Sequence, residues 1–96
     1  MDEQRGTSGK VIGRQYLRSA TSIGANIHEA QSGESRADFI HKLSIAQKEA
    51  RESLYWLRLL EESDTVTKSR LQPLIKETDE IIAIITKIIV NSKKKS

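Results

Sequence analysis

Chemically versatile side chains gather in residues 21–35, which read TSIGANIHEAQSGES. A His-Glu pair, an asparagine, two glycines and several hydroxyls could hold a phosphate or a metal, or could mark the junction of two helices. Phosphate-binding loops need the spacing G-x-G-x-x-G or G-x-x-x-x-G-K-[ST], and the chain contains neither. Gly33 can end a helix with a positive φ, and Ser35 followed by Asp38 is typical of a helix start. The segment is therefore predicted to be a tight corner between two antiparallel helices.

The two histidines do not complete a metal or catalytic motif. His28-Glu29 begins the zinc motif H-E-x-x-H, but residue 32 is a serine. Asp38 and His41 have the i, i+3 spacing of one half of a carboxylate di-metal site, which needs a second such pair. No serine stands in a credible arrangement with a histidine and an acid for nucleophilic catalysis. We therefore expect no catalytic residue, no metal, no cofactor and no enzymatic activity.

Long helices in a single domain, residues 1–96, are predicted to position these side chains. One proline and five glycines leave long uninterrupted segments, and 36% hydrophobic residues suffice for one modest core. Apolar residues recur with helical spacing over about 11–30, 36–62 and 69–91, between polar termini. The inward-facing residues are predicted to be Ile12, Tyr16, Ala20, Ile23, Ile27 and Ala30, then Phe39, Leu43, Ala46, Ala50, Ser53, Leu57 and Leu60, then Leu71, Leu74, Ile75, Ile81, Ile82, Ile85, Ile88 and Ile89.

Local features refine these helices. Gly24 lies inside the first helix, where glycine costs ~1 kcal/mol relative to alanine, and close approach of another helix is the simplest compensation. Asn26 lies at the edge of the buried face and is expected to hydrogen-bond a neighbouring backbone. Ser69 and Gln72 can form a capping box for the third helix, with Pro73 in its first turn.

Further apolar residues fall outside the inward stripes. Ile45, Tyr55, Trp56 and Leu59 form a second stripe on the helix over 36–62, and Ile84 lies outside the inner face of the last helix. A helix whose outer face contacts only water would be expected to carry polar side chains there. These apolar residues are therefore predicted to form an interface between the subunits of a homo-oligomer.

The chain is mildly basic, with a formal net charge of +3 and a pI of about 9.3. This charge permits binding to RNA without requiring it. The candidate nucleic-acid contacts are Arg14, Arg18, Lys48, Arg51, Arg58, Lys93, Lys94 and Lys95. The alternative for each is an ordinary solvated charge, often offset by a nearby glutamate. The absence of cysteine, a polar N-terminus and an apolar run (81–90) shorter than the ~20 residues of a membrane span favour the cytoplasm.

Residues 17–63 resemble the family of 23S rRNA-intervening-sequence proteins, which are small bacterial four-helix-bundle proteins. The segments SIGANIHEA (22–30), SRADFIHKL (35–43) and EARESLYWLRLL (49–60) are similar to its characteristic stretches, and the resemblance continues more weakly over 71–89. The resemblance implies an all-α antiparallel bundle that assembles as a homo-oligomer, with a pentamer favoured. It also implies a structural role for the signature residues Asn26 and Glu29.

The chain departs from the family pattern at its N-terminus. Members usually have a further long helix before the signature helix, whereas about ten polar residues precede Val11 here. The first helix is therefore expected to be missing or shortened, unless the signature helix starts earlier or a neighbouring chain completes the bundle.

These patterns predict a non-enzymatic, oligomeric helical-bundle protein that binds RNA or another nucleic acid through basic surface residues. The alternative is a protein-interaction or scaffolding module without nucleic-acid binding, which the second apolar stripe motivates. A continuous basic surface would favour the first function, and cations paired with carboxylates would favour the second. We expect neither a small-molecule substrate nor membrane binding.

Overall fold

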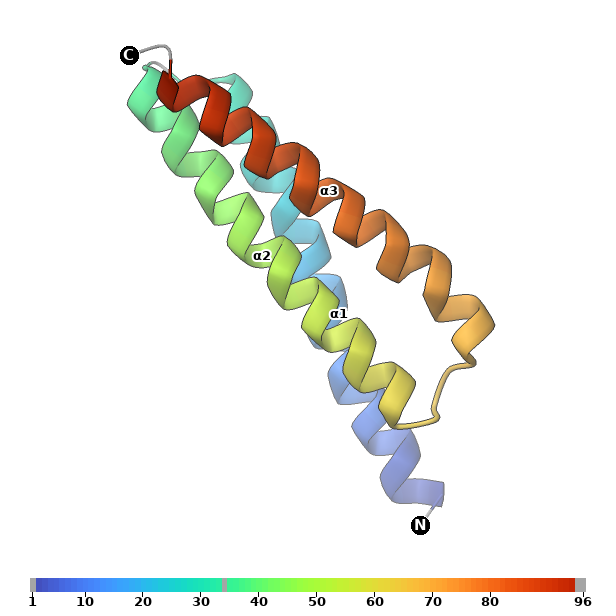
Figure 1. Ribbon diagram of the computed structural model, residues 1–96. Helices are drawn as coiled ribbons and strands as arrows, with labels where there is room; N and C mark the ends of the chain where they lie inside the picture. The colour runs from blue at the N-terminus through green and yellow to red at the C-terminus, as the bar shows by residue number, and fades with distance from the viewer. Residues whose placement is uncertain (1, 34, 95–96) are drawn as a thin grey trace.

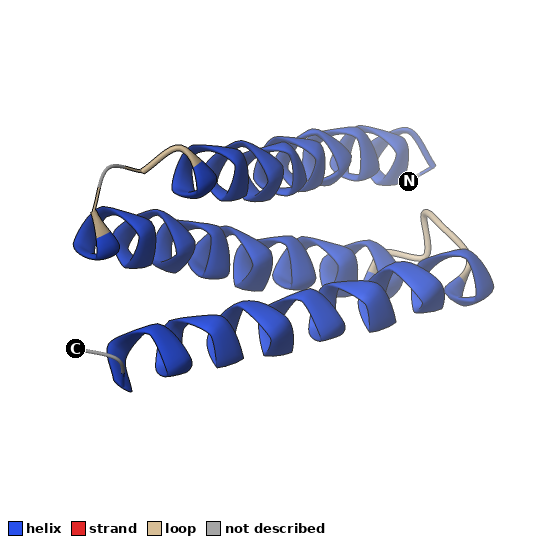
Figure 2. Ribbon diagram, turned by 90° about the horizontal axis from the view of Figure 1, so that it is seen from above, coloured by secondary structure: helices blue, strands red, loops and turns tan. Residues whose placement is uncertain are grey.

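The computed structural model describes residues 2–33 and 35–94, which form three helices. Helix α1 spans Asp2–Gln31, α2 spans Arg36–Glu62 and α3 spans Lys68–Lys94. Consecutive helices run antiparallel, and α2 lies between the other two (Figure 1 and Figure 2). No described residue belongs to a strand, so the all-α prediction is confirmed.

The three helices form a flat, elongated layer. The molecule measures 55 × 20 × 13 Å and has a radius of gyration of 15.6 Å. A compact domain of this length would have a radius of gyration of about 12–13 Å. Helix α2 packs along both neighbours, whereas the backbones of α1 and α3 do not approach each other closely. Parts of the apolar faces of α1 and α3 therefore lack a covering element.

The heptad seam of α2 is buried as predicted, and it organises the core. Its buried residues are Leu43, Ala46, Ala50, Ser53, Leu57 and Leu60. One cluster joins the first half of α2 to Ile23 and Ala30 of α1 and to Ile85 and Ile89 of α3. A second cluster joins Leu57 and Leu60 to Leu71, with half-buried Ile12, Tyr16, Val66 and Ile75 around them. The core thus consists of two apolar blocks along the length of the layer.

A polar layer separates the two apolar blocks. Ser19, Ser53 and Thr78, one from each helix, are all buried at this level. The Ser53 hydroxyl donates to the Ser19 hydroxyl at 2.8 Å, and Ser19 donates to the Tyr16 carbonyl at 3.0 Å. Thr78 donates to the Leu74 carbonyl at 2.7 Å. Each buried hydroxyl therefore has a partner, which keeps the cost of its burial low.

The start of α1 differs from the prediction, because the helix begins at Asp2 and not near Val11. Its first turns extend past the loop that joins α2 to α3 (Figure 1). Gly9 is buried there, and a Cβ atom at this position would collide with the Thr65 side chain. A helix end that runs past the core needs no apolar stripe. The polar sequence of residues 2–10 therefore gives no periodic sign of the helix.

The corner between α1 and α2 is built partly as predicted. Ser35 caps α2, because its side-chain oxygen accepts the Asp38 backbone N–H at 3.0 Å. The prediction of a positive φ at Gly33 is wrong, since no described glycine has one. A Cβ atom on Gly33 would lie 2.8 Å from the Asp38 carboxylate and 3.1 Å from the Ala30 carbonyl oxygen. Glycine is thus needed here for the close approach of the next helix.

The start of α3 also departs from the prediction. The helix begins at Lys68, so Ser69 lies inside it and the capping box with Gln72 does not form. The Gln72 side chain donates instead to the Glu61 carboxylate at 2.8 Å, which ties α3 to the end of α2. Pro73 consequently lies in the second turn of the helix and not in the first.

The predicted inner face of α3 is only partly covered. Leu71, Ile85 and Ile89 are buried, but Leu74, Ile81 and Ile88 are 37%, 36% and 38% exposed. Leu74 and Ile81 lie on the side of α3 towards α1, where both line a cavity. None of the helices in the described ranges is long and apolar enough to cross a membrane.

Candidate nucleic-acid interface

Helix α2 presents a basic ridge on the side away from the core, which we define as Lys48, Arg51, Tyr55 and Arg58. Spacings of three and four residues place these side chains along one helix face, and all four are exposed. Within the described ranges, none of the three cations takes part in an ion pair. The ridge therefore presents three uncompensated positive charges over about 15 Å of helix.

Tyr55 lies between the cations of the basic ridge. Its ring is 56% exposed and makes an edge-to-face contact with Trp56, with ring centroids 5.0 Å apart and an interplanar angle of 67°. The contact supports the ring from one side and leaves it accessible to a stacking partner. The apolar pattern predicted Tyr55 only as part of a subunit interface, although the spacing 48, 51, 55, 58 already indicated an aromatic ring among cations.

Arg18, another candidate cation, forms ion pairs with two glutamates of α2. Its guanidinium lies 2.6 Å from the Glu52 carboxylate and 3.3 Å from the Glu49 carboxylate. The hydrogen bond from Arg18 lowers the pKa of Glu52, and the same hydrogen bond raises the pKa of Arg18. Arg18 therefore links α1 to α2, and its charge is largely offset by its neighbours.

The remaining candidate cations lie apart from the basic ridge. Arg14 is exposed on α1 and has no ion pair within the described ranges. Lys93 and Lys94 are exposed in the last turn of α3, which lies beside the corner between α1 and α2 (Figure 1). Lys95 lies outside the described residues. The structure thus gathers Lys48, Arg51 and Arg58 and leaves the other candidates dispersed.

The signature residues make contacts within the chain. The Asn26 amide donates to the Ser22 carbonyl at 2.9 Å, one turn earlier in α1, so its backbone partner belongs to its own helix. Glu29 forms an ion pair of 2.9 Å with Lys42 and so joins α1 to α2 near their corner. The hydrogen bond from Lys42 lowers the pKa of Glu29, while Glu29 raises the pKa of Lys42.

The side chains considered as metal ligands stay dispersed. His28 and His41 are exposed, on α1 and α2 respectively. In the part of the chain that the structure describes, no three histidine, aspartate or glutamate side chains gather as a metal ion would require.

The predicted interface residues are only partly covered. Ile45, Trp56 and Leu59 are half-buried on α2, while Ile84 on α3 is 59% exposed. The indole nitrogen of Trp56 is buried, and the nearby indole N–H contributes to the lowered pKa of Glu52. These apolar groups belong to two different faces, one on α2 and one on α3.

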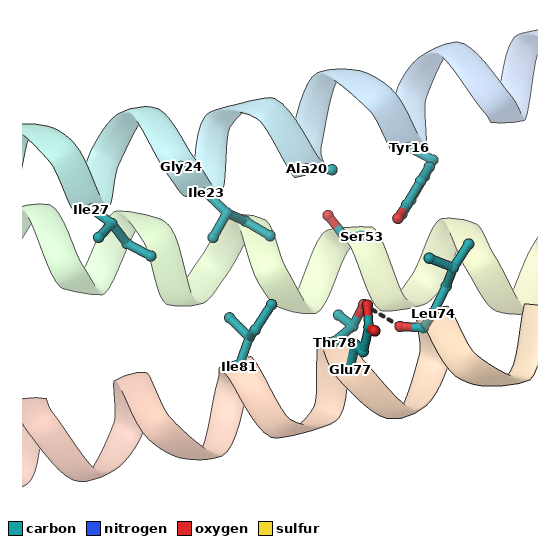
Figure 3. Close-up of a pocket in the computed structure, with 10 residues that line it drawn as sticks. All are labelled: Tyr16, Ala20, Ile23, Gly24, Ile27, Ser53, Leu74, Glu77, Thr78 and Ile81. Atoms are coloured by element: carbon teal, nitrogen blue, oxygen red, sulfur yellow. Dashed lines mark hydrogen bonds between the residues drawn. The ribbon is translucent and has the colours of Figure 1, made fainter.

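A mainly apolar cavity of about 350 Å³ opens between α1 and α3 (Figure 3). Burial raises the pKa of the Tyr16 hydroxyl in its wall, and the nearby Glu77 carboxylate adds to this effect. Gly24 belongs to the same wall, and a Cβ atom there would have nothing within 4 Å. The close helix packing predicted over Gly24 is therefore not made within this chain. The lining residues are Tyr16, Ala20, Ile23, Gly24 and Ile27 of α1, Ser53 of α2, and Leu74, Glu77, Thr78 and Ile81 of α3.

Comparisons with known proteins agree with the helical fold. A crystal structure from Bacteroides thetaiotaomicron, described as a protein with unknown function from the S23 ribosomal protein family, is 48% identical to this chain. The match has a TM-score of 0.80 and covers 82% of this chain and 73% of that chain. A comparison with curated proteins found no match. Residues 6–87 match the family model of the 23S rRNA-intervening sequence protein, and this range includes most of all three helices. The chain therefore belongs to the 23S rRNA-intervening sequence protein family.

Proposed function

We propose that this protein is a non-catalytic, self-associating helical protein that binds RNA in the cytoplasm through the basic ridge of α2. The observation that carries the proposal is the alignment of Lys48, Arg51 and Arg58 along one exposed helix face, with Tyr55 among them. Cations spaced along a rigid element attract a chain of phosphates, and this attraction does not depend on base sequence. An exposed aromatic ring among the cations adds a surface on which an unpaired base can stack.

Self-association would strengthen this modest electrostatic attraction. One basic ridge supplies three cations, which is few for stable binding at physiological salt. Two or more copies of the ridge on one particle raise the effective concentration of each further contact once the first has formed. The cysteine-free chain is in keeping with a reducing compartment.

The test is fluorescence anisotropy of a labelled ribosomal RNA hairpin with an unpaired loop, titrated with protein over a salt series. We expect binding to weaken steeply with salt. Lys48→Gln, Arg51→Gln and Arg58→Gln should each reduce the slope of log affinity against log salt by about 0.7–0.9. Arg36→Gln is the matched control, because it removes an exposed cation of α2 outside the ridge.

Two outcomes would contradict the proposal. The first is an absence of binding at low salt by a folded wild-type protein. The second is an equal loss of affinity in the three ridge variants and in Arg36→Gln, which would indicate a response to net charge alone. Tyr55→Ala adds a separate check, because it should weaken binding to the unpaired loop more than binding to a fully paired duplex.

A scaffolding role is the second candidate, and a specific observation favours it. Trp56 lies in the half-buried stripe with Ile45 and Leu59, on a face of α2 that the other helices leave partly open. A docked protein would gain by covering these apolar side chains. A protein that self-associates but does not bind RNA at low salt would support this second function.

A further inference from the structure

A glutamate beside the basic ridge of α2 could neutralise part of it. Glu52 follows Lys48 by four residues and precedes Tyr55 by three, so it neighbours both on the helix surface. A lysine and a glutamate four residues apart on an exposed helix form a weakly stabilising ion pair. If Glu52 had no other partner, it would pair with Lys48. One of the three cations of the ridge would then be unavailable to a phosphate.

Arg18 of α1 binds this carboxylate instead. Its guanidinium lies 2.6 Å from the Glu52 carboxylate and 3.3 Å from the Glu49 carboxylate. Both glutamates are half-buried, whereas Lys48 is exposed and has no ion pair within the described ranges. The planar guanidinium carries several N–H donors in a fixed geometry, so it can serve two carboxylates at once. The contact with α1 therefore holds Glu52 in place of a pair with Lys48.

Trp56 adds a second donor on the same side of Glu52. It follows Glu52 by four residues and is therefore its neighbour on the helix surface. The hydrogen bond from Arg18 is the main cause of the lowered pKa of Glu52, and the indole N–H of Trp56 adds to it. The Tyr55 ring of the ridge rests against Trp56, with ring centroids 5.0 Å apart. Arg18, Glu52 and Trp56 thus form one cluster at the edge of the ridge.

We propose that Arg18 is a positioning residue for RNA binding, which holds Glu52 away from Lys48 and so keeps all three ridge cations available to phosphates. Arg18 acts through Glu52 and does not touch the RNA, because its own charge is offset by the two glutamates. The inference rests on the proposed function and deepens it, since it names a residue of α1 that controls the charge of a surface on α2.

The first experiment measures the salt dependence of RNA binding by Arg18→Gln, with the labelled ribosomal RNA hairpin. In this variant Glu52 is free to pair with Lys48. The slope of log affinity against log salt should therefore fall by about 0.7–0.9, as it should for Lys48→Gln, because one phosphate contact is lost. Circular dichroism of each variant verifies that the helices remain folded.

The second experiment adds Glu52→Gln to Arg18→Gln. No carboxylate then remains to pair with Lys48 at this position, so the double variant should recover the wild-type slope. A direct contact between Arg18 and a phosphate would leave the slope reduced. A purely structural role would leave it reduced as well, because the double variant still lacks the ion pair between Arg18 and Glu52.

The matched control adds Glu80→Gln to Arg18→Gln. Glu80 is exposed on α3 and has no ion pair within the described ranges. The two double variants have the same net charge, but only one of them removes the carboxylate beside Lys48. The control should therefore bind RNA as weakly as Arg18→Gln alone.

Three results would overturn the inference alone: a slope that falls in Lys48→Gln but not in Arg18→Gln, a double variant with Glu52→Gln that stays reduced, or an equal recovery in the control with Glu80→Gln. Each of these leaves RNA binding by the ridge in place. A folded wild type that does not bind the hairpin at low salt removes the proposed function, and this inference with it.

Discussion

At the scale of single residues, the Arg18–Glu52 ion pair joins α1 to α2 and makes stability depend on pH. Because the hydrogen bond from Arg18 lowers the pKa of Glu52 in the folded state, the pair stabilises the fold above the ordinary carboxylate pKa of 4.5. This contribution is lost as the pH falls through the lowered pKa of the folded state. We expect Glu52→Gln to be less stable than wild type at pH 7 and equally stable at about pH 2.

Urea unfolding at these two pH values measures the effect. Glu62→Gln is the matched control, because Glu62 is an exposed glutamate of the same helix and has no ion pair within the described ranges. A Glu52→Gln variant whose deficit is the same at both pH values would show that the carboxylate charge is not the source of the stabilisation.

The buried serine pair gives a second prediction at this scale. Ser53 donates to Ser19 at 2.8 Å, and both residues are almost fully buried. Ser19→Ala should cost about 1–3 kcal/mol, because it leaves the Ser53 hydroxyl without its partner. Adding Ser53→Ala should cost little more, since the unpaired group is then removed. A double-mutant cycle by urea unfolding measures the coupling, and strictly additive losses would contradict the assignment.

The partners of single residues could not be predicted from the sequence. The heptad pattern of α2 predicted that Ser53 faces inward, but its partner Ser19 lies 34 positions away and no local pattern indicates this pairing. The pairing of Arg18 with Glu49 and Glu52 likewise spans 31 and 34 positions. Spacing along the chain predicts which face a side chain occupies, whereas the identity of the opposing residue depends on how two helices align.

At the scale of elements, the glycines of α1 have opposite roles. A Cβ atom at Gly9 would collide with the Thr65 side chain in the loop between α2 and α3, whereas one at Gly13 would meet nothing within 4 Å. We expect Gly13→Ala to stabilise the protein by about 0.5–1 kcal/mol through helix propensity. Gly9→Ala should lose that gain, because the loop has to move.

Thermal unfolding of the two alanine variants at one low protein concentration compares them directly. Equal stabilisation by both substitutions would contradict the contact between Gly9 and Thr65. Destabilisation by Gly13→Ala would mean that another chain packs against that position of α1.

The helices could be predicted from the sequence where the spacing of apolar residues follows the buried face. The α2 seam and the Ser35 cap follow directly from residue type and spacing, and both are confirmed. The first turns of α1 lie past the core, so their polar sequence gave no periodic signal. On α3, periodicity correctly grouped Leu74, Ile81 and Ile88 as apolar, but it does not state which element covers them.

At the scale of the whole molecule, the three helices leave one side of the layer open. The described residues form a three-helix layer with a mainly apolar cavity between α1 and α3. The apolar surface left there is the reason to expect association.

Concentration-dependent thermal stability is the expected consequence. If copies of the chain associate, as the proposed function requires, folding and association are coupled, and a tenfold increase in protein concentration should raise the Tm by about 2–4 °C. The melting temperature of Ile84→Asp, which alters a predicted interface residue, should not change with concentration. That of Val90→Asp, at another exposed apolar position of α3, should follow the wild type. A wild-type Tm that stays constant over a hundredfold range would mean that the two apolar blocks around α2 stabilise the layer by themselves. The exposed isoleucines of α3 would then need another explanation than a second copy of the chain.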